Sequence, residues 1–444
     1  MVKRNLLNAL LAFALVLTSS VGTSAYANID EWKALDDQFG TLFNQGNYDR
    51  AEEVANQSLV VAEKSFAPDH PAVAASLSNL ATLYRTQGQY AKAEPLYQRS
   101  LAIREKALGP DHPEVAQSLN NLATLYINQS QNAKAEPLYQ RSLAIREKAL
   151  GPDHTAVATS LNNLAALYAN QYQYAKAEPL YQRSLAIREK VLGPDHPAVA
   201  TSLNNLAVLY ANQSQYAKAE PLYQRSLAIK EKVLGPDHLN VAQSLENLAE
   251  LYVSQGQNVK AEPLYLRSLT IREKALGPDH PDVALSLNKL AVLYVNQSQY
   301  AKAEPLYQRS LAIREKALGP DHPDAAQSLN NLATLYVNQS QYAKAEPLYQ
   351  RSLAIREKAL GPDHPDVAQS LNNLATLYVN QSHYAKAEPL YQRSLAIREK
   401  ALGPDHTAVA TSLNNLAELY LATNRNHEAD QLQWRAKSIL SIKR

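Results

Sequence analysis

The chain is built around the stretch GPDHPEVAQSLNNLATLYINQSQNAKAEPLYQRSLAIREKAL (109–150), which recurs almost unchanged along the sequence. Its Pro-Asp-His triplet returns every 42 residues, with the aspartate at positions 69, 111, 153, 195, 237, 279, 321, 363 and 405. A fixed period of this length is typical of stacked supersecondary units. The repeat, rather than any single residue, therefore decides the fold class.

Each repeat is predicted to form two helices, one over about 114–129 and one over about 132–150. In the first, apolar residues recur at three- and four-residue spacing and so share one helix face: Leu119, Leu122, Ala123 and Tyr126. Gly109 fits the left-handed residue that follows a helix, and Asp111 is the expected N-cap of the next one.

One such hairpin cannot bury its apolar face alone, whereas stacked hairpins share a continuous core. The sequence therefore predicts an all-α fold, a right-handed solenoid of about ten helical hairpins with no strand. A divergent first hairpin is expected over 28–67, eight 42-residue hairpins over 68–406 and a capping hairpin over 407–444.

These residues resemble a known family. The pattern Leu119, Leu122, Ala123, Tyr126, Ala135 and Tyr139, with Tyr174 opening the second helix of the next copy, is similar to the tetratricopeptide repeat. The period and the runs LNNLA, AEPLYQRSLAIREK and LGPDHP resemble its kinesin light chain type, over nearly all of 29–442. The heptad segment that joins kinesin light chains to their motor has no counterpart here, so a motor role is not expected.

The N-terminus resembles a cleavable signal peptide over residues 1–27. Lys3 and Arg4 precede an apolar run over 6–17, and Ala25-Tyr26-Ala27 fits a small-residue cleavage site. An uncleaved anchor is the less favoured alternative, because spanning a bilayer takes about 20 apolar residues. We expect an exported protein, periplasmic or secreted, whose mature chain has no transmembrane segment.

Composition narrows the function classes. The chain has no cysteine, which excludes disulfides and thiolate metal sites. Its net charge is +2 with both signs interspersed, and no basic tract favours a nucleic acid partner. No phosphate-binding glycine loop or nucleophile motif is present. We therefore expect no enzyme activity, no cofactor and no small-molecule substrate.

The nine Asp-His pairs resemble metal or catalytic sites only in isolation. Neighbouring copies should lie two helix widths apart, roughly 16–20 Å, whereas zinc–nitrogen bonds are about 2.1 Å. A structural role at the turn between repeats is favoured. The recurring Asn-Gln-Ser sequons could accept glycans in a eukaryotic secretory pathway, but a helix end followed by a turn explains them as well.

The remaining candidate is the polar face of the first helices, which the resemblance implies is a concave groove for an extended peptide. In the resembling family, groove asparagines hold the peptide backbone, and an amide can both donate and accept. One repeat contributes Gln117, Asn120, Thr124 and Asn128, and the asparagine row continues at Asn162, Asn204, Asn288, Asn330, Asn372 and Asn414. A polar face that merely needs solvation is the alternative.

One repeat departs from the others and suggests a specialised place in the groove. Glu246 replaces the row asparagine, Glu250 lies one turn later, and Leu285 and Lys289 follow in the next repeat. We expect Glu246, Glu250, Leu285 and Asn288 to form a hot spot for a basic peptide, unless Lys289 neutralises the carboxylates or the changes are drift. Two function classes remain open, a scaffold that binds a protein or peptide and a structural protein that assembles through its ends or convex face.

Overall fold

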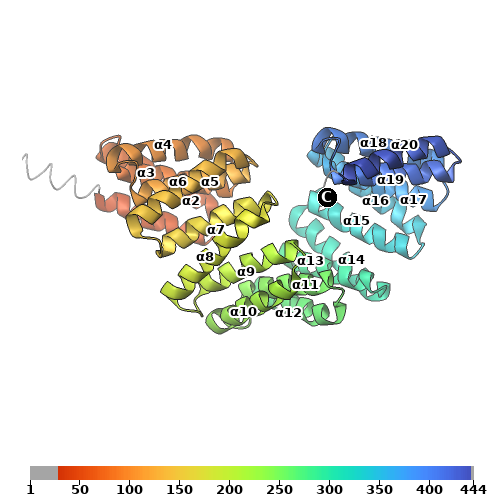
Figure 1. Ribbon diagram of the computed structural model, residues 1–444, viewed down its shortest axis with the longest axis horizontal. Helices are drawn as coiled ribbons and strands as arrows, with labels where there is room; N and C mark the ends of the chain where they lie inside the picture. Colours follow the sequence, from red (N-terminus) through yellow and green to blue (C-terminus); the bar gives the residue numbers. More distant parts are fainter. Residues whose placement is uncertain (1–28, 442–444) are drawn as a thin grey trace, which may run out of the picture. The chain divides into compact units, whose positions relative to one another are not determined.

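The computed structural model describes residues 29–441, and these fold into α-helices and short turns without a β-strand among them (Figure 1). The predicted signal peptide and the last three residues lie outside this part of the chain. Two compact units can be distinguished, Met1–Ile229 and Lys230–Arg444, with their boundary inside helix α10.

The first unit begins with a helix over residues 29–44. Its further helices are α2 (Tyr48–Ser65), α3 (Pro71–Thr86), α4 (Tyr90–Leu108), α5 (Pro113–Asn128), α6 (Asn132–Leu150), α7 (Thr155–Asn170), α8 (Tyr174–Leu192), α9 (Pro197–Asn212) and α10 (Tyr216–Leu234), which runs past the boundary. Helices α5 and α6 match the expected pair of helices to within one residue at each end.

The second unit continues the same alternation of shorter and longer helices. Its helices are α11 (Leu239–Ser254), α12 (Asn258–Leu276), α13 (Pro281–Asn296), α14 (Tyr300–Leu318), α15 (Pro323–Asn338), α16 (Tyr342–Leu360), α17 (Pro365–Asn380), α18 (Tyr384–Leu402), α19 (Thr407–Ala422) and α20 (Asn426–Ser441).

Consecutive helices pack as hairpins, and each hairpin packs on the next. Helix α5 contacts α6 within its hairpin and α4 from the preceding one, and α15 relates to α16 and α14 in the same way. The first helices of neighbouring hairpins also touch, as α7 does α9 and α15 does α17. The predicted all-α solenoid of helical hairpins is confirmed.

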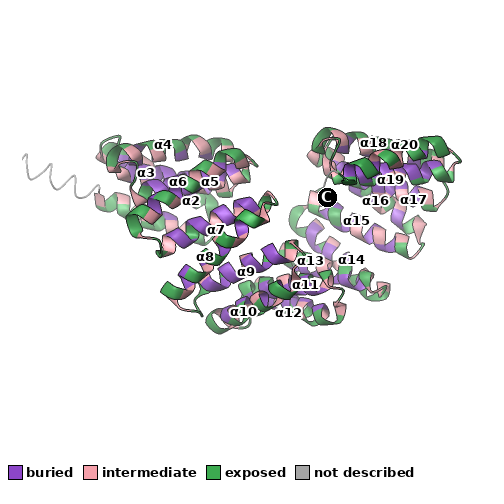
Figure 2. Cartoon of the chain, viewed as in Figure 1, coloured by how far each residue is buried: buried purple, intermediate pink, exposed green. Residues whose placement is uncertain are grey.

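The core follows the predicted apolar face. Leu119, Leu122, Ala123 and Tyr126 on α5 are all buried, and Tyr139 on α6 is buried against them. Figure 2 shows buried residues along helices of both units, such as α7, α9 and α15. Each core cluster also takes a residue from the preceding hairpin, as Leu101 of α4 packs against the cluster of Leu119, so neighbouring hairpins complete one another's core.

The turn that precedes each first helix is capped by histidine rather than aspartate. The Nδ1 atom of His112 accepts a hydrogen bond from the backbone N–H of Glu114 at 3.2 Å. Asp111, the expected N-cap, instead forms an ion pair with Lys148 at 2.5 Å. The prediction of the cap residue was wrong by one position, because the spacing alone does not show which side chain turns toward the helix.

Two kinds of turn separate the helices. Gly109 has φ +87° and ψ 156°, a combination that is open essentially only to glycine. At the turn within each hairpin a residue adopts the left-handed conformation, and at Ser130 its φ is +60°. Both turns are local, which explains why the same short motif recurs with the repeat.

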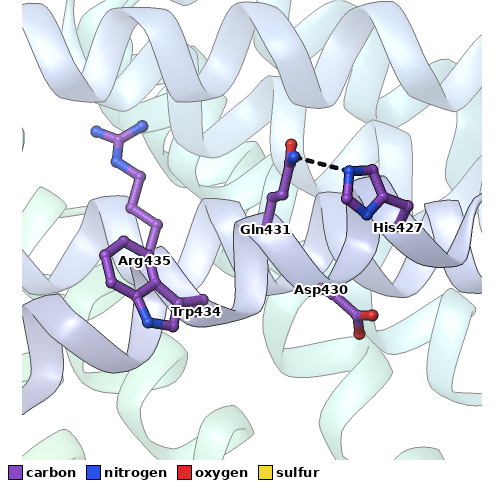
Figure 3. Close-up of a pocket in the computed structure, with 5 residues that line it drawn as sticks. All are labelled: His427, Asp430, Gln431, Trp434 and Arg435. Atoms are coloured by element: carbon purple, nitrogen blue, oxygen red, sulfur yellow. Dashed lines mark hydrogen bonds between the residues drawn. The ribbon is translucent and has the colours of Figure 1, made fainter.

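The last hairpin ends in a partly apolar surface on α20. Ile439 is buried in the final core cluster, whereas Trp434 is 72% exposed. Figure 3 shows Trp434 beside a recess lined also by His427, Gln431 and Arg435. The polar Lys437 is exposed on the same helix, as expected for a capping hairpin.

Candidate ligand-binding face

In several repeats the polar face of the first helix is organised by a buried arginine from the second helix. Arg146 Nη1 donates to Ser160 Oγ at 2.9 Å in the next repeat. Its Nη2 atom donates to Gln117 Oε1 at 2.6 Å. Burial lowers the pKa of Arg146. The guanidinium therefore links two repeats and holds Gln117 in place at the exposed edge of the face.

The asparagine row connects adjacent repeats. Asn163 Nδ2 donates to Asn120 Oδ1 at 2.8 Å, over a separation of 43 residues. The same contact recurs between Asn205 and Asn162, Asn331 and Asn288, Asn373 and Asn330, and Asn415 and Asn372. The Oδ1 atoms of these row asparagines are therefore already engaged by the chain itself.

The asparagines of this row are less exposed than polar side chains on a fully solvated helix face would be. Asn120, Asn330 and Asn372 are buried, while Asn162, Asn204, Asn288 and Asn414 are partly exposed. Thr124 is also partly exposed and shares a hydrogen bond with the Tyr139 hydroxyl at 2.9 Å. Gln117 and Asn128 lie exposed at the two ends of α5. Of the predicted residues on α5, these last two are the most accessible to a ligand.

Sequence reasoning missed a second asparagine row. Asn121 is partly exposed and accepts a hydrogen bond from Gln117 Nε2 at 2.8 Å through its Oδ1 atom. Gln243 with Asn247, Gln327 with Asn331 and Gln369 with Asn373 repeat this pair. The run LNNLA contains both asparagines, but its spacing alone does not show which one faces the next repeat.

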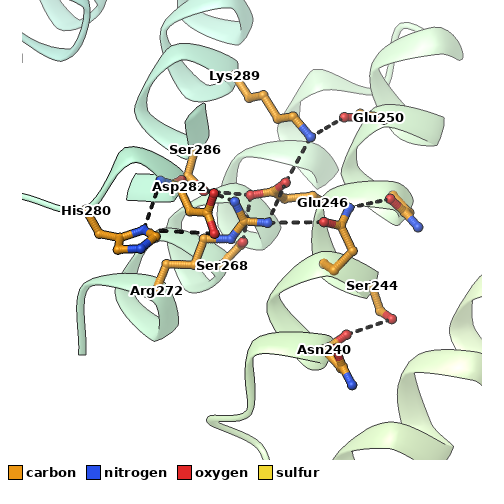
Figure 4. Close-up of polar contacts among 12 residues, drawn as sticks. Asn240, Ser244, Glu246, Glu250, Ser268, Arg272, His280, Asp282, Ser286 and Lys289 are labelled. Carbon is orange, nitrogen blue, oxygen red and sulfur yellow. Dashed lines mark hydrogen bonds and ion pairs between the residues drawn. The ribbon is translucent and has the colours of Figure 1, made fainter. Parts of the chain in front are cut away.

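Glu246 lies at the centre of a buried polar network (Figure 4). Its Oε1 atom accepts hydrogen bonds from Ser268 at 3.0 Å and Ser286 at 2.6 Å. Its Oε2 atom lies 3.2 Å from Arg272 Nη2 and 2.9 Å from Lys289 Nζ. Glu246 is completely buried, so the expectation that its carboxylate lies on the exposed face was wrong.

Lys289 supplies the cation that neutralises both carboxylates. Its Nζ atom lies 2.7 Å from Glu250 Oε1 as well as against Glu246. Burial alone would lower the pKa of Lys289, but the hydrogen bonds and charges of the two glutamates outweigh it and raise this pKa. The pair Glu246–Lys289 thus occupies the place of an Asn–Asn contact, in charged form.

The rest of the expected hot spot is distributed around this network. Glu250 and Leu285 are exposed, and Asn288 is half-buried and bonded to Asn331. Burial and the charges of Glu250 and Glu246 raise the pKa of Tyr265. A basic ligand is therefore not required to balance the glutamates, and Glu250 and Leu285 are the residues that remain accessible.

Metal binding and membrane spanning find no support in residues 29–441. Over residues 29–441, no group of three or more histidine, aspartate or glutamate side chains converges as metal ligands would. His112 and its counterparts in the Asp-His pairs use Nδ1 to cap a helix. None of the described helices has the length and hydropathy needed to cross a bilayer.

Comparison with known proteins agrees with this architecture. A tetratricopeptide repeat model matches nine overlapping stretches that together run from residue 40 to 440. The chain belongs to the tetratricopeptide repeat family. No protein with a curated description matches it.

Solved structures include relatives of the kinesin light chain type. BtubC (BKLC) from P. vanneervenii is 27% identical, covering 55% of this chain and 93% of its own, with a TM-score of 0.44. A variant of a putative kinesin light chain from P. anserina is 31% identical and covers 46% of this chain and 97% of its own, with a TM-score of 0.42. The family match confirms the predicted tetratricopeptide repeat pattern.

More distant structures share the fold over a longer stretch. RapI is 13% identical and covers 83% of this chain and 98% of its own, with a TM-score of 0.57. A Rap protein complexed with Competence and Sporulation Factor is 15% identical and covers 84% of this chain and 98% of its own, with a TM-score of 0.51. Repeats of this family form scaffolds that are generally not enzymes and that typically mediate contacts between proteins.

Proposed function

We propose that this protein is an exported scaffold that holds an extended peptide of a partner protein against the polar face of its first helices. The observation that carries the proposal is the recurring Gln–Asn pair, such as Gln117 with Asn121, on helices that touch across repeats. A peptide backbone offers one donor and one acceptor per residue, and amides match both whatever its side chains are.

The accessible part of this face differs from the set first expected. Gln117 and Asn121, with their counterparts in other repeats, are better placed than the asparagines buried between repeats. Buried Arg146 and its counterparts hold these glutamines and so reduce the rotamer entropy lost on binding. A preorganised row of amides is what recognition of an extended backbone requires.

The groove is tested by capture and mutation. The mature chain, immobilised, is used to isolate a partner from the exported fraction, and affinity for that partner is then measured. Gln327→Ala combined with Gln369→Ala on the first helices is expected to weaken binding roughly tenfold. The matched control, Gln350→Ala with Gln392→Ala, removes exposed glutamines from second helices α16 and α18. Equal effects of the two variants would contradict the groove.

Export is a separate part of the proposal and rests on the basic start, apolar run and Ala-Tyr-Ala site of residues 1–27. Cleavage after Ala27 is the expected outcome. The intact mass of the protein from its native source checks it, and a mass that includes residues 1–27 would refute processing without affecting the groove.

A structural role through assembly of several copies is the second candidate, and the exposure of Trp434 on α20 favours it. Most interior repeats have glutamine at the equivalent position, as at Gln392, and one has Leu266. Size measured over a range of concentrations decides between the candidates. Association that Trp434→Gln abolishes would support assembly, whereas a monomer at high concentration would remove it.

A further inference from the structure

One turn of the first unit carries two aromatic rings where the equivalent turns of other repeats carry one or none. Tyr172 lies between α7 and α8, is 81% exposed, and meets Tyr174 edge to face with ring centroids 6.2 Å apart. Together with Ala169, Asn170 and Asn212 these rings line a recess of about 470 Å³. The recess lies at the C-terminal ends of the first helices α7 and α9, where Asn170 and Asn212 are the counterparts of Asn128.

Tyr172 occupies a position that the backbone does not favour for it. Its φ is +60°, in the left-handed region where a bulky side chain is an outlier. The equivalent positions hold glycine, serine or asparagine: Gly46, Gly88, Ser130, Ser214, Gly256, Ser298, Ser340, Ser382 and Asn424. An exposed ring at this place adds nothing to the core, so its contribution lies at the surface.

A second departure enlarges the same recess. Ala169 lies on its lining, where most other repeats have a larger side chain at the equivalent position: Ile127, Val253, Val295, Val337 and Val379. One repeat therefore combines an added ring with a shortened neighbour. Tyr174, Asn170 and Asn212 belong to the common repeat pattern, so only two substitutions distinguish this turn.

The chemistry of the lining indicates the ligand. None of the five lining residues carries a charge, so the recess suits a neutral group. Two rings meeting at 79° form an apolar corner for a small saturated ring. The amides and tyrosine hydroxyls are donors for carbonyl groups. A polyproline II segment offers both a small saturated ring and free carbonyl groups, because its proline rings project outward and its carbonyls make no internal hydrogen bonds.

We propose that the recess around Tyr172 binds a polyproline II segment of a partner protein. A helical ligand would use its carbonyls internally, and a β-strand would need an open sheet edge, neither of which this corner accommodates. The proline ring packs into the corner between Tyr172 and Tyr174, and Asn170 and Asn212 donate to the exposed carbonyls. The site does not use the Gln–Asn pairs that carry the proposed groove, such as Gln117 with Asn121, so the two proposals are tested by different variants.

The test uses the full mature chain and fluorescein-labelled decaproline, with affinity measured by fluorescence anisotropy. Tyr172→Ser introduces the residue that most other turns have and preserves folding, as circular dichroism verifies. It is expected to weaken binding roughly tenfold, because an aromatic contact is lost. A flexible glycine-serine peptide of equal length should not bind, and Tyr172→Phe should retain most of the affinity.

Transferring the two distinguishing substitutions to another turn tests whether they are enough to create the binding site. The turn with Asn338, Tyr342 and Asn380 lacks only the two distinguishing substitutions. Val337→Ala with Ser340→Tyr, added to the Tyr172→Ser variant, is expected to restore decaproline binding. The proposal is overturned if decaproline does not bind, if Tyr172→Ser binds it equally, or if the graft restores nothing. Binding of cellohexaose in place of decaproline, lost in Tyr172→Ser, would replace it by a carbohydrate site.

Discussion

At the scale of single residues, the pair Glu246–Lys289 is the clearest departure from the repeat. Elsewhere two asparagines join adjacent hairpins at this place. Glu246→Asn alone removes the carboxylate from buried Arg272 and half-buried Lys289, and we expect it to lower the free energy of unfolding by about 3–5 kcal/mol. Urea unfolding followed by circular dichroism measures the change.

The double variant is the control for this prediction. Glu246→Asn with Lys289→Asn recreates the contact seen between Asn330 and Asn373. Its stability is expected to lie within about 1 kcal/mol of the natural chain, since a buried ion pair can often be replaced at little cost. Additive losses in the two single variants would show that the two side chains do not act together.

An exposed carboxyl at the inter-repeat turn gives a pH-dependent prediction. A hydrogen bond from Lys400, and then its charge, hold the pKa of Asp363 below the ordinary value of 3.8. A lowered pKa in the folded state contributes stability above pH 3.8 that is lost as the pH falls through the folded-state pKa. Carboxyl ¹³C NMR should show this low titration.

The counterpart variant Lys400→Gln removes both the hydrogen bond and the charge. The Asp363 carboxyl is then expected to titrate near its ordinary value, and high salt should produce part of the same change because the pair is exposed. A titration midpoint that does not move in Lys400→Gln would assign the low pKa to the helix end instead.

At the scale of secondary structure, the turn inside each hairpin is under mild strain. Ser130 has a φ of +60°, where an L-residue costs roughly 1–2 kcal/mol. Ser130→Gly removes this cost but increases the entropy of the unfolded chain by roughly 0.5–1 kcal/mol. We expect a net gain of a few tenths to about 1 kcal/mol in the free energy of unfolding.

The equivalent turns with glycine allow the reverse substitution to be measured. Gly88 and Gly256 occupy the same turn position with φ of +74° and +72°. Gly256→Ser should therefore lower stability by a similar amount, and a side chain has open space there, so no clash contributes. Loss of stability in Ser130→Gly together with a gain in Gly256→Ser would show that the serine hydroxyl, and not the backbone, determines the preference.

At the scale of the whole molecule, the contacts between described helices within each unit are mainly between helices adjacent in sequence, with weaker ones between successive first helices. Leu122 is buried in the α5–α6 hairpin, and Leu122→Ala is expected to cost about 2–5 kcal/mol through lost contacts and a cavity. Because coupling is between nearest neighbours, amide hydrogen exchange should accelerate in α5, α6 and the adjoining helices, with α15 to α18 unaffected. A uniform acceleration along the chain would show global cooperativity instead.

The helix pattern could be read from the sequence because it depends on local spacing. Leu119, Leu122 and Tyr126 define one face by their separation along a single helix, and Gly109 marks the turn by its backbone preference. The 42-residue period then requires the hairpins to stack, since one hairpin cannot bury its own apolar face. The helix faces, the turns and the stacking of hairpins can therefore be predicted without knowing which side chains contact one another across repeats.

Only the tertiary structure decided which polar side chains remain available to a ligand. Asn120 meets Asn163 and Glu246 meets Lys289, each across 43 residues of sequence. A helix of 3.6 residues per turn places adjacent residues such as Asn120 and Asn121 about 100° apart, so spacing identifies the polar side of the helix but not its contact with the next repeat. The packing of neighbouring hairpins buries Asn120, Asn330 and Asn372 of one asparagine row, and it leaves the other members of that row and the second row partly exposed.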